Sequence, residues 1–162
     1  MRELEKFERA ELDDELFGYT VAESSEYLLM ASECDLIMDG YKIIGKQEIS
    51  LRQKDDETRF SSKILELEES LEEINWDLAL ILTSMESALM GLKQLDEFVL
   101  LEDEEHVLIG FGQIMEVNES QIKLRPFDGA GGFEEAEDIS LEDIFTISFG
   151  TRYLKLNAKY SS

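Results

Sequence analysis

Two residues of the chain belong to types that often do chemistry in proteins, and neither has a suitable neighbour in the sequence. His106, the single histidine, follows the acidic run 102–105 and precedes a predicted strand. No second His or Cys stands near it, so the spacing indicates an exposed loop residue and not a metal ligand or general acid. Cys34, the single cysteine, lies between Glu33 and Asp35, whose charges oppose a thiolate. We therefore expect Cys34 to pack as a small apolar side chain.

The glycine-rich segment 128–132 is a further candidate for a ligand site. Its sequence, Asp-Gly-Ala-Gly-Gly, has the small residues of a phosphate-binding loop. No Lys followed by Ser or Thr comes after it at the spacing of such loops, and acids within 134–138 would repel a phosphate. We interpret the segment as a hairpin tip. The sequence thus predicts no catalytic, metal-binding or cofactor-binding residue, and a protein that is not an enzyme.

The charge of the chain narrows the classes of partner. Its 162 residues include 15 Lys and Arg against 38 Asp and Glu, which gives a net charge of −23. Nucleic acids and anionic membranes are bound through clustered cations, so this charge disfavours both. A basic protein partner is favoured instead. The lone cysteine, and the charged opening segment 1–6 with no apolar run behind it, predict a cytoplasmic protein of bacterial type without a secretory signal.

The middle of the chain carries the strongest periodic pattern and must be helical. Apolar residues recur there every three or four positions, at Ile64, Leu67, Leu71, Ile74, Leu78, Ile81, Met85, Ala88, Leu92 and Leu95. With Ser62 as N-cap, one helix ending near 97 would be about 50 Å long. The favoured interpretation is a broken helix, with Asn75 as a second N-cap. The alternative is a straight helix that forms a homodimeric coiled coil through the 64–95 stripe.

Strand-type runs occupy both ends of the chain. They lie at 17–21 and 27–30, and then at 98–101, 109–117, 121–125, 144–149 and 153–156. A shift of 95 residues aligns Ser25 with Ser120, Leu29 with Leu124, Ile44 with Ile139 and Ile49 with Ile144. The order of strands and turns is also shared in this frame. This predicts two small five-stranded units related by an internal repeat.

The C-terminal unit resembles a known fold. An apolar strand leads to a second strand with Gly110 and Gly112 and a turn at Asn118, and the segment 147–154 looks like a motif of hydrophobic residue, Arg and Gly before a closing strand. In these features the unit resembles the Sm-like, SH3-like small β-barrels. The resemblance implies an α+β, mainly β fold with two such barrels: an N-terminal small β-barrel at 1–61, a helical connector at 62–97 and a C-terminal Sm-like barrel at 98–162.

The chain departs from that family where nucleotides are bound. RNA-binding members hold a nucleotide with a turn Asn and with an Arg before the motif Gly, whereas Gln121 or Ile122 and Phe149 stand at the matching places here. The resemblance therefore implies the fold without the base-stacking and phosphate contacts. Fold and function separate in this way in many families.

We therefore expect a non-enzymatic protein-protein interaction or regulatory module that binds a basic or apolar partner. One alternative is an acidic antagonist, either a nucleic-acid mimic or an immunity protein that neutralises a basic enzyme. A second alternative is Sm-like nucleic-acid binding, which the charge disfavours. Apolar residues at helical spacing are usually core, but the segment around Trp76 could also form a partner-binding stripe. The candidate partner-binding residues are Trp76, Leu78, Ile81, Met85, Leu92, Phe149, Arg152 and Tyr153.

Overall fold

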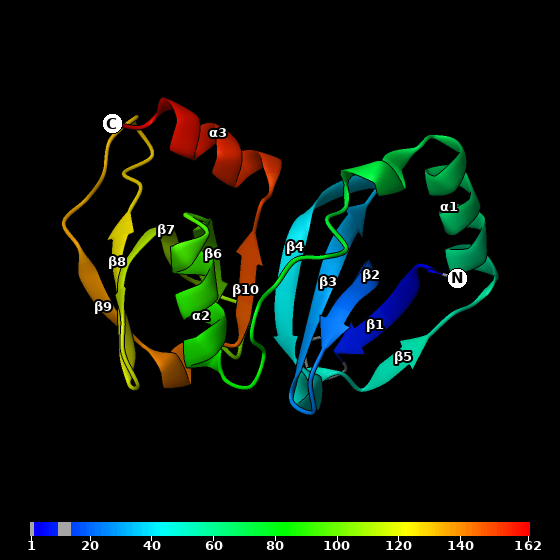
Figure 1. Ribbon diagram of the computed structural model, residues 1–162, viewed down its shortest axis with the longest axis horizontal. Helices are drawn as coiled ribbons and strands as arrows, with labels where there is room; N and C mark the ends of the chain where they lie inside the picture. The colour runs from blue at the N-terminus through cyan, green and yellow to red at the C-terminus, as the bar shows by residue number, and fades with distance from the viewer. Residues whose placement is uncertain (1, 10–13) are drawn as a thin grey trace. The chain divides into compact units, whose positions relative to one another are not determined.

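The computed structural model describes residues 2–9 and 14–162, and the chain divides into two units, Met1–Leu78 and Ala79–Ser162 (Figure 1). The described residues form a mixed α+β fold that is mainly antiparallel β, which confirms the predicted fold class at that level. No helix within the described part of the chain is long and apolar enough to cross a membrane.

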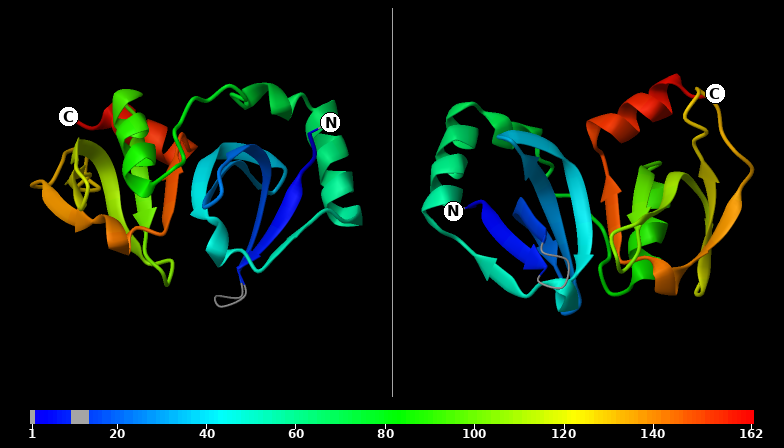
Figure 2. Two further views of the ribbon diagram at one scale, coloured as in Figure 1. Left: turned by 60° about the horizontal axis from the view of Figure 1, so that its bottom comes forward. Right: turned by 180° about the vertical axis from the view of Figure 1, so that it is seen from behind.

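The first unit is built on five antiparallel strands in the order β5-β1-β2-β3-β4. Their bounds are β1 Glu5–Arg9, β2 Asp14–Glu23, β3 Tyr27–Cys34, β4 Ile37–Gly45 and β5 Leu51–Gln53. A 3-10 turn, η2 (Lys46–Glu48), precedes β5, and the helix α1 (Asp56–Leu67) and a second 3-10 turn, η3 (Ser70–Glu73), follow it. Figure 2 shows the start of β1 beside α1.

Two apolar clusters lie on opposite faces of these strands. On β3, Ala31 belongs to one cluster, and Leu28 and Met30, which lie three positions and one position before it, belong to the other, because successive side chains of a strand point to opposite faces. The first cluster also contains Leu65 of α1 and Ile74, so the helical segment covers that face. We call it the outer cluster; its buried members are Leu4, Tyr19, Ala31, Leu65 and Ile74.

The second unit has five antiparallel strands in the order β10-β6-β7-β8-β9. Their bounds are β6 Phe98–Glu102, β7 Leu108–Val117, β8 Gln121–Pro126, β9 Glu137–Ser140 and β10 Thr146–Phe149. The helix α2 (Met85–Gln94) precedes them, a 3-10 turn, η4 (Leu141–Asp143), precedes β10, and the helix α3 (Arg152–Tyr160) ends the unit.

Alternation along β8 shows how the core of the second unit forms. Ile122 and Leu124 are fully buried and Lys123 between them is exposed, as a strand with one face on a core requires. Leu89 and Leu92 of α2 are fully buried as well, and α2 packs against β7. All four residues of β10 are buried.

The middle segment forms two separate helices, so the straight-helix alternative, and the coiled coil that needs it, are wrong. α1 begins earlier than predicted, because Asp55 caps it by accepting a hydrogen bond from the Thr58 amide, and Ser62 lies inside the helix. α2 begins after the N-cap Ser84. Asn75 caps no helix; its side chain accepts a hydrogen bond from the Asp77 amide in a turn.

Two smaller predictions also need correction. The run 153–156 lies within α3 and is not a strand, because Thr151 accepts a hydrogen bond from the Leu154 amide at 3.1 Å and caps a helix. Cys34 does not pack in a core; it is exposed at the end of β3.

Candidate functional site

Five aromatic side chains of the second unit stack into a continuous group, which we call the aromatic row: Phe98, Phe111, Phe127, Phe133 and Tyr153. Phe127 lies at the centre, with its ring centroid 5.3 Å from that of Phe98, 4.8 Å from Phe111 and 5.2 Å from Phe133. Tyr153 extends the row, 5.1 Å from Phe111 with the ring planes only 6° apart. The quadrupole of an aromatic ring gives its face a negative electrostatic potential, so such a row can bind cations and flat groups.

The exposure of the row varies along its length. Phe127 is buried, Phe98, Phe111 and Phe133 are half-buried, and Tyr153 is 62% exposed. At the Phe133 end a cation is already in place, because the Arg125 guanidinium lies 3.8 Å from that ring centroid. The row therefore carries its own cation at one end and is open to solvent at the other.

The sequence around Phe111 explains why this ring lies away from the main core. Gly112, its neighbour on β7, faces a side without space, since a Cβ there would collide with the carbonyl oxygen of Arg125. Phe111 points to the opposite face because strand side chains alternate. Thr151 caps α3 and so places Tyr153 in the first helical turn, where its ring reaches Phe111.

A hollow of about 400 Å³ lies beside Phe98, between the start of β6 and α3. Glu97, which precedes β6, and Lys155 of α3 both line it. Burial raises the pKa of Glu97, and Lys155 acts in the opposite direction. The segment after Phe133 contributes exposed acids at positions 134, 135, 137 and 138. The row is thus bordered by carboxylates and by the basic α3.

The predicted partner-binding residues of the second unit lie in different environments. Tyr153 is in the aromatic row and Arg152 beside it is exposed. Ile81 is 65% exposed in the segment before α2. Met85, Leu92 and Phe149 are buried core residues, because the apolar stripe of α2 and the strand β10 pack into the unit, and they offer no surface to a partner.

The two remaining predicted residues, Trp76 and Leu78, belong to the first unit, and both are half-buried. Trp76 packs on the outer cluster, edge-on to Tyr19 with ring centroids 5.9 Å apart. The guanidinium of Arg2 lies 4.0 Å from the Trp76 ring centroid. Trp76 is therefore mainly a packing residue with a cation over one face.

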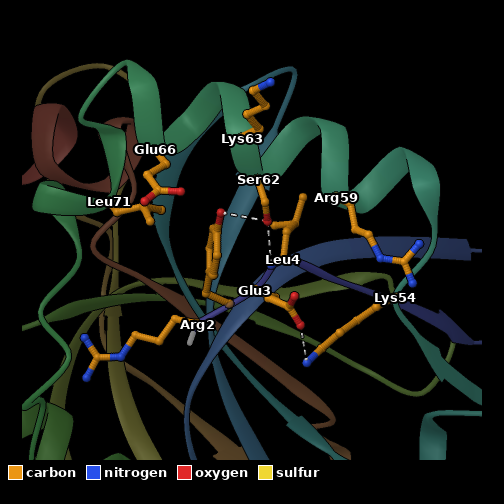
Figure 3. A pocket seen from close by; sticks show the side chains of 10 residues that line it. Arg2, Glu3, Leu4, Lys54, Arg59, Ser62, Lys63, Glu66 and Leu71 are labelled. Carbon is orange, nitrogen blue, oxygen red and sulfur yellow. Dashed lines mark hydrogen bonds and ion pairs between the residues drawn. The ribbon is translucent and has the colours of Figure 1, made fainter.

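The first unit also contains a pocket of about 610 Å³ between the segment before β1, one face of α1 and η3 (Figure 3). Ser62 lies at its centre, where its Oγ accepts hydrogen bonds from the Leu4 amide at 2.8 Å and the Tyr19 hydroxyl at 3.2 Å. The predicted N-cap Ser62 therefore has a different role: it joins α1 to the residue before β1 and to β2.

Sequence reasoning missed most of the row and all of the pocket. Phe98 begins β6, Phe111 lies within β7, and Phe127 and Phe133 belong to the segment between β8 and β9. They are distant in the sequence, and the pairing of the strands brings them together. One signal was present for the pocket: Arg59, Ser62, Lys63 and Glu66 follow the spacing of a single helix face.

Within the described ranges 2–9 and 14–162, no group of three His, Cys, Asp or Glu side chains lies close enough together to bind a metal ion. His106 is half-buried in the turn after β6, with a φ of 60°. No protein-family model matches the sequence, and comparisons with curated proteins and with solved structures find no match either.

Proposed function

We propose that the protein is a non-enzymatic protein-protein interaction module, made of two small Sm-like or SH3-like barrels that are related by an internal repeat. In this proposal the aromatic row of the second unit receives a basic segment of the partner. The observation that carries it is the stack of Tyr153 on Phe111, which leaves an open aromatic face in a strongly acidic protein.

The repeat is supported by the order of elements in the two units. In each unit the fifth strand pairs with the first, and the order continues through the second, third and fourth. The 3-10 turns 46–48 and 141–143 lie 95 residues apart, which is the shift found in the sequence. The second strand of each unit also has an irregular register, between Thr20 and Ala22 and between Ile114 and Glu116.

The chemistry of the partner follows from the row and its surroundings. Arg125 over Phe133 is an example, within the chain, of a guanidinium held by the row. A basic side chain of a partner would find the same kind of contact on Tyr153, worth about 0.5–1 kcal/mol at an exposed site. The net charge of −23 adds attraction at longer range, which salt weakens.

The positions that would hold a nucleotide in RNA-binding relatives of the resembled family argue for this choice over nucleic-acid binding. Ile122 and Phe149 stand at such positions, and both are buried. The Asn118 carboxamide oxygen accepts hydrogen bonds from the Ser120 and Gln121 amides, so it serves the turn itself.

The test is an NMR titration of the full chain with a peptide of four Arg-Gly repeats, compared with four Glu-Gly repeats. We expect amide shifts around Phe111 and Tyr153 with the basic peptide and none with the acidic one. Tyr153→Ala should weaken binding about threefold to fivefold. The control, Tyr160→Ala, changes an exposed tyrosine of the same helix that lies outside the row, and should leave binding unchanged.

Two results would count against the proposal. The absence of shifts with the basic peptide at low salt would remove it. Binding that salt abolishes but Tyr153→Ala does not alter would support the acidic antagonist, because charge alone would then account for the affinity.

A further inference from the structure

The pocket of the first unit gathers positive charge in a chain whose overall charge is strongly negative. Four cations line it, Arg2, Lys54, Arg59 and Lys63, against two carboxylates, Glu3 and Glu66. These are 4 of the 15 basic residues of the protein, and they give the lining a net charge of +2 in a chain of −23. The volume of about 610 Å³ is in the range of small-molecule sites.

The cations of the pocket differ in how far their charge is already balanced. Lys54 Nζ lies 2.9 Å from Glu3 Oε2, and this lysine lowers the pKa of the Glu3 carboxyl. Arg59 pairs with Asp56 at 3.0 Å, but both side chains are exposed, so the pair is weak. Within the described part of the chain, Lys63 and Arg2 form no ion pair; Arg2 lies over Trp76.

The rest of the lining combines hydroxyl groups with apolar surface. Ser62 Oγ accepts hydrogen bonds from the Leu4 amide and the Tyr19 hydroxyl, and neither of these two bonds uses the proton of the Ser62 hydroxyl. Burial raises the pKa of Tyr19, so its phenol stays protonated and keeps donating at neutral pH. Leu4 and Leu71 supply apolar contacts. Figure 3 shows Leu4 between the helix face and the strands.

We propose that this pocket binds a small organic anion, one with a carboxylate or phosphate group and a compact apolar body. The anionic group would lie near Lys63 and Arg59 on α1, and the apolar body against Leu4 and Leu71. The site is independent of the aromatic row, which lies in the other unit and is proposed for a basic partner.

The test is a titration of the full chain, followed by amide NMR shifts, with phenyl phosphate and with benzoate. Benzyl alcohol serves as the uncharged probe of similar body. We expect shifts around Leu4, Ser62 and Leu71 with at least one of the two anions and much weaker shifts with the alcohol. Comparison of the two anions identifies the preferred group.

Variants of exposed residues on α1 separate a built site from non-specific adsorption, because they change the charge of the pocket without altering the core. Lys63→Gln should weaken binding about threefold to fivefold, and Glu66→Gln should strengthen it by a similar factor. The matched control is Lys123→Gln, an exposed lysine of β8 in the other unit, which should have no effect.

Three outcomes would overturn the proposal. They are an absence of shifts with either anion at millimolar concentration, equal binding of benzyl alcohol, and equal weakening by Lys63→Gln and Lys123→Gln. Each is separable from a failure of the proposed protein-binding function, which is measured at different residues with a basic peptide.

Discussion

Tyr153 lies flat on Phe111, with ring centroids 5.1 Å apart and ring planes that differ by 6°. One ring comes from the first turn of α3 and the other from the middle of β7, so the contact fastens the last helix to the sheet of its unit. Leu154, the next residue, is the one buried side chain of α3. The stack therefore does two things: it supports α3 and it presents an aromatic face.

The stack should contribute measurably to stability. We expect Tyr153→Ala to lower the free energy of unfolding by about 0.5–1.5 kcal/mol, the range found for aromatic pairs. Tyr153→Phe should keep most of it, because the ring and not the hydroxyl makes the contact. Urea unfolding followed by circular dichroism measures both. Tyr160→Ala, at a position that is 70% exposed, should stay within about 0.5 kcal/mol of the wild type.

Two leucines of α1 should differ strongly in their effect on the first unit. Leu65 is fully buried in the outer cluster, whereas Leu67 is 72% exposed. We expect Leu65→Ala to destabilise the protein by about 2–4 kcal/mol, because it leaves a cavity, and Leu67→Ala to change stability by no more than about 0.5 kcal/mol. Equal costs in urea unfolding would mean that α1 does not pack as described.

Two strands of the second unit, β7 and β8, were predictable because the burial along them alternates with a period of two. The prediction for 121–125 differs from β8, Gln121–Pro126, by one residue, and that for 109–117 differs from β7, Leu108–Val117, by one. The run 153–156, Tyr-Leu-Lys-Leu, alternates equally well and is nevertheless helical. The helix there depends on the Thr151 cap and on the burial of Leu154, and the alternation of apolar and polar residues predicts neither of these.

The helical middle shows where the periodic pattern stops being informative. Its apolar spacing continues past the end of α1 at Leu67, but Glu69 has a φ of 58° and ends the helical path. Leu71 and Ile74 still reach the outer cluster, through η3 and the residue after it. Apolar residues spaced three and four apart therefore identified the side chains that pack on the cluster. The spacing did not predict whether the backbone between them stays helical.

The aromatic row could not be predicted for a different reason. Its members Phe98, Phe127 and Tyr153 are far apart in the sequence. Strand pairing brings the first two together, and the packing of α3 on Phe111 adds Tyr153. Tyr153 was a candidate from the motif around 147–154. Its partner Phe111 stood between two glycines of a strand and carried no signal of its own.

Asp55 should make stability depend on acid pH. The hydrogen bond from the Thr58 amide, together with Lys6, lowers the pKa of this carboxyl. A group with a lowered folded-state pKa stabilises the protein above its unfolded value, about 3.9, and this contribution disappears as the pH falls through the folded value. Asp55→Asn keeps a good N-cap that does not titrate. Its stability should therefore fall less steeply than that of the wild type between about pH 5 and pH 2.

Urea unfolding at several pH values measures this difference. The control is Glu57→Gln, which alters an exposed carboxylate of the same turn that accepts no capping hydrogen bond. We expect its pH profile to follow that of the wild type. Parallel profiles for Asp55→Asn and the wild type would show that the cap contributes nothing to the acid sensitivity.

Arg52 should be more important than the other surface arginines, because it balances a buried carboxylate. Its Nε donates to Glu5 Oε2 at 2.7 Å and its Nη1 to Glu23 Oε2 at 2.8 Å. These hydrogen bonds, the one to Glu5 first, raise the pKa of Arg52. Glu5 is among the few buried charged residues of the described chain. In Arg52→Ala, the Glu5 carboxylate would keep the Thr20 hydroxyl as a hydrogen-bond donor, at 2.9 Å.

We expect Arg52→Ala to destabilise the protein by about 1–3 kcal/mol, a value reduced for the partial exposure of the arginine. Arg52→Lys should recover only part of the loss, because one ammonium cannot donate along the fork that reaches Glu5 and Glu23 together. Adding Glu5→Gln to Arg52→Ala should recover stability, since it removes the buried charge. Arg59→Ala is the matched control on an exposed arginine. If urea unfolding gave the same small cost for Arg52→Ala and Arg59→Ala, the Glu5 carboxylate would have to be solvated without Arg52.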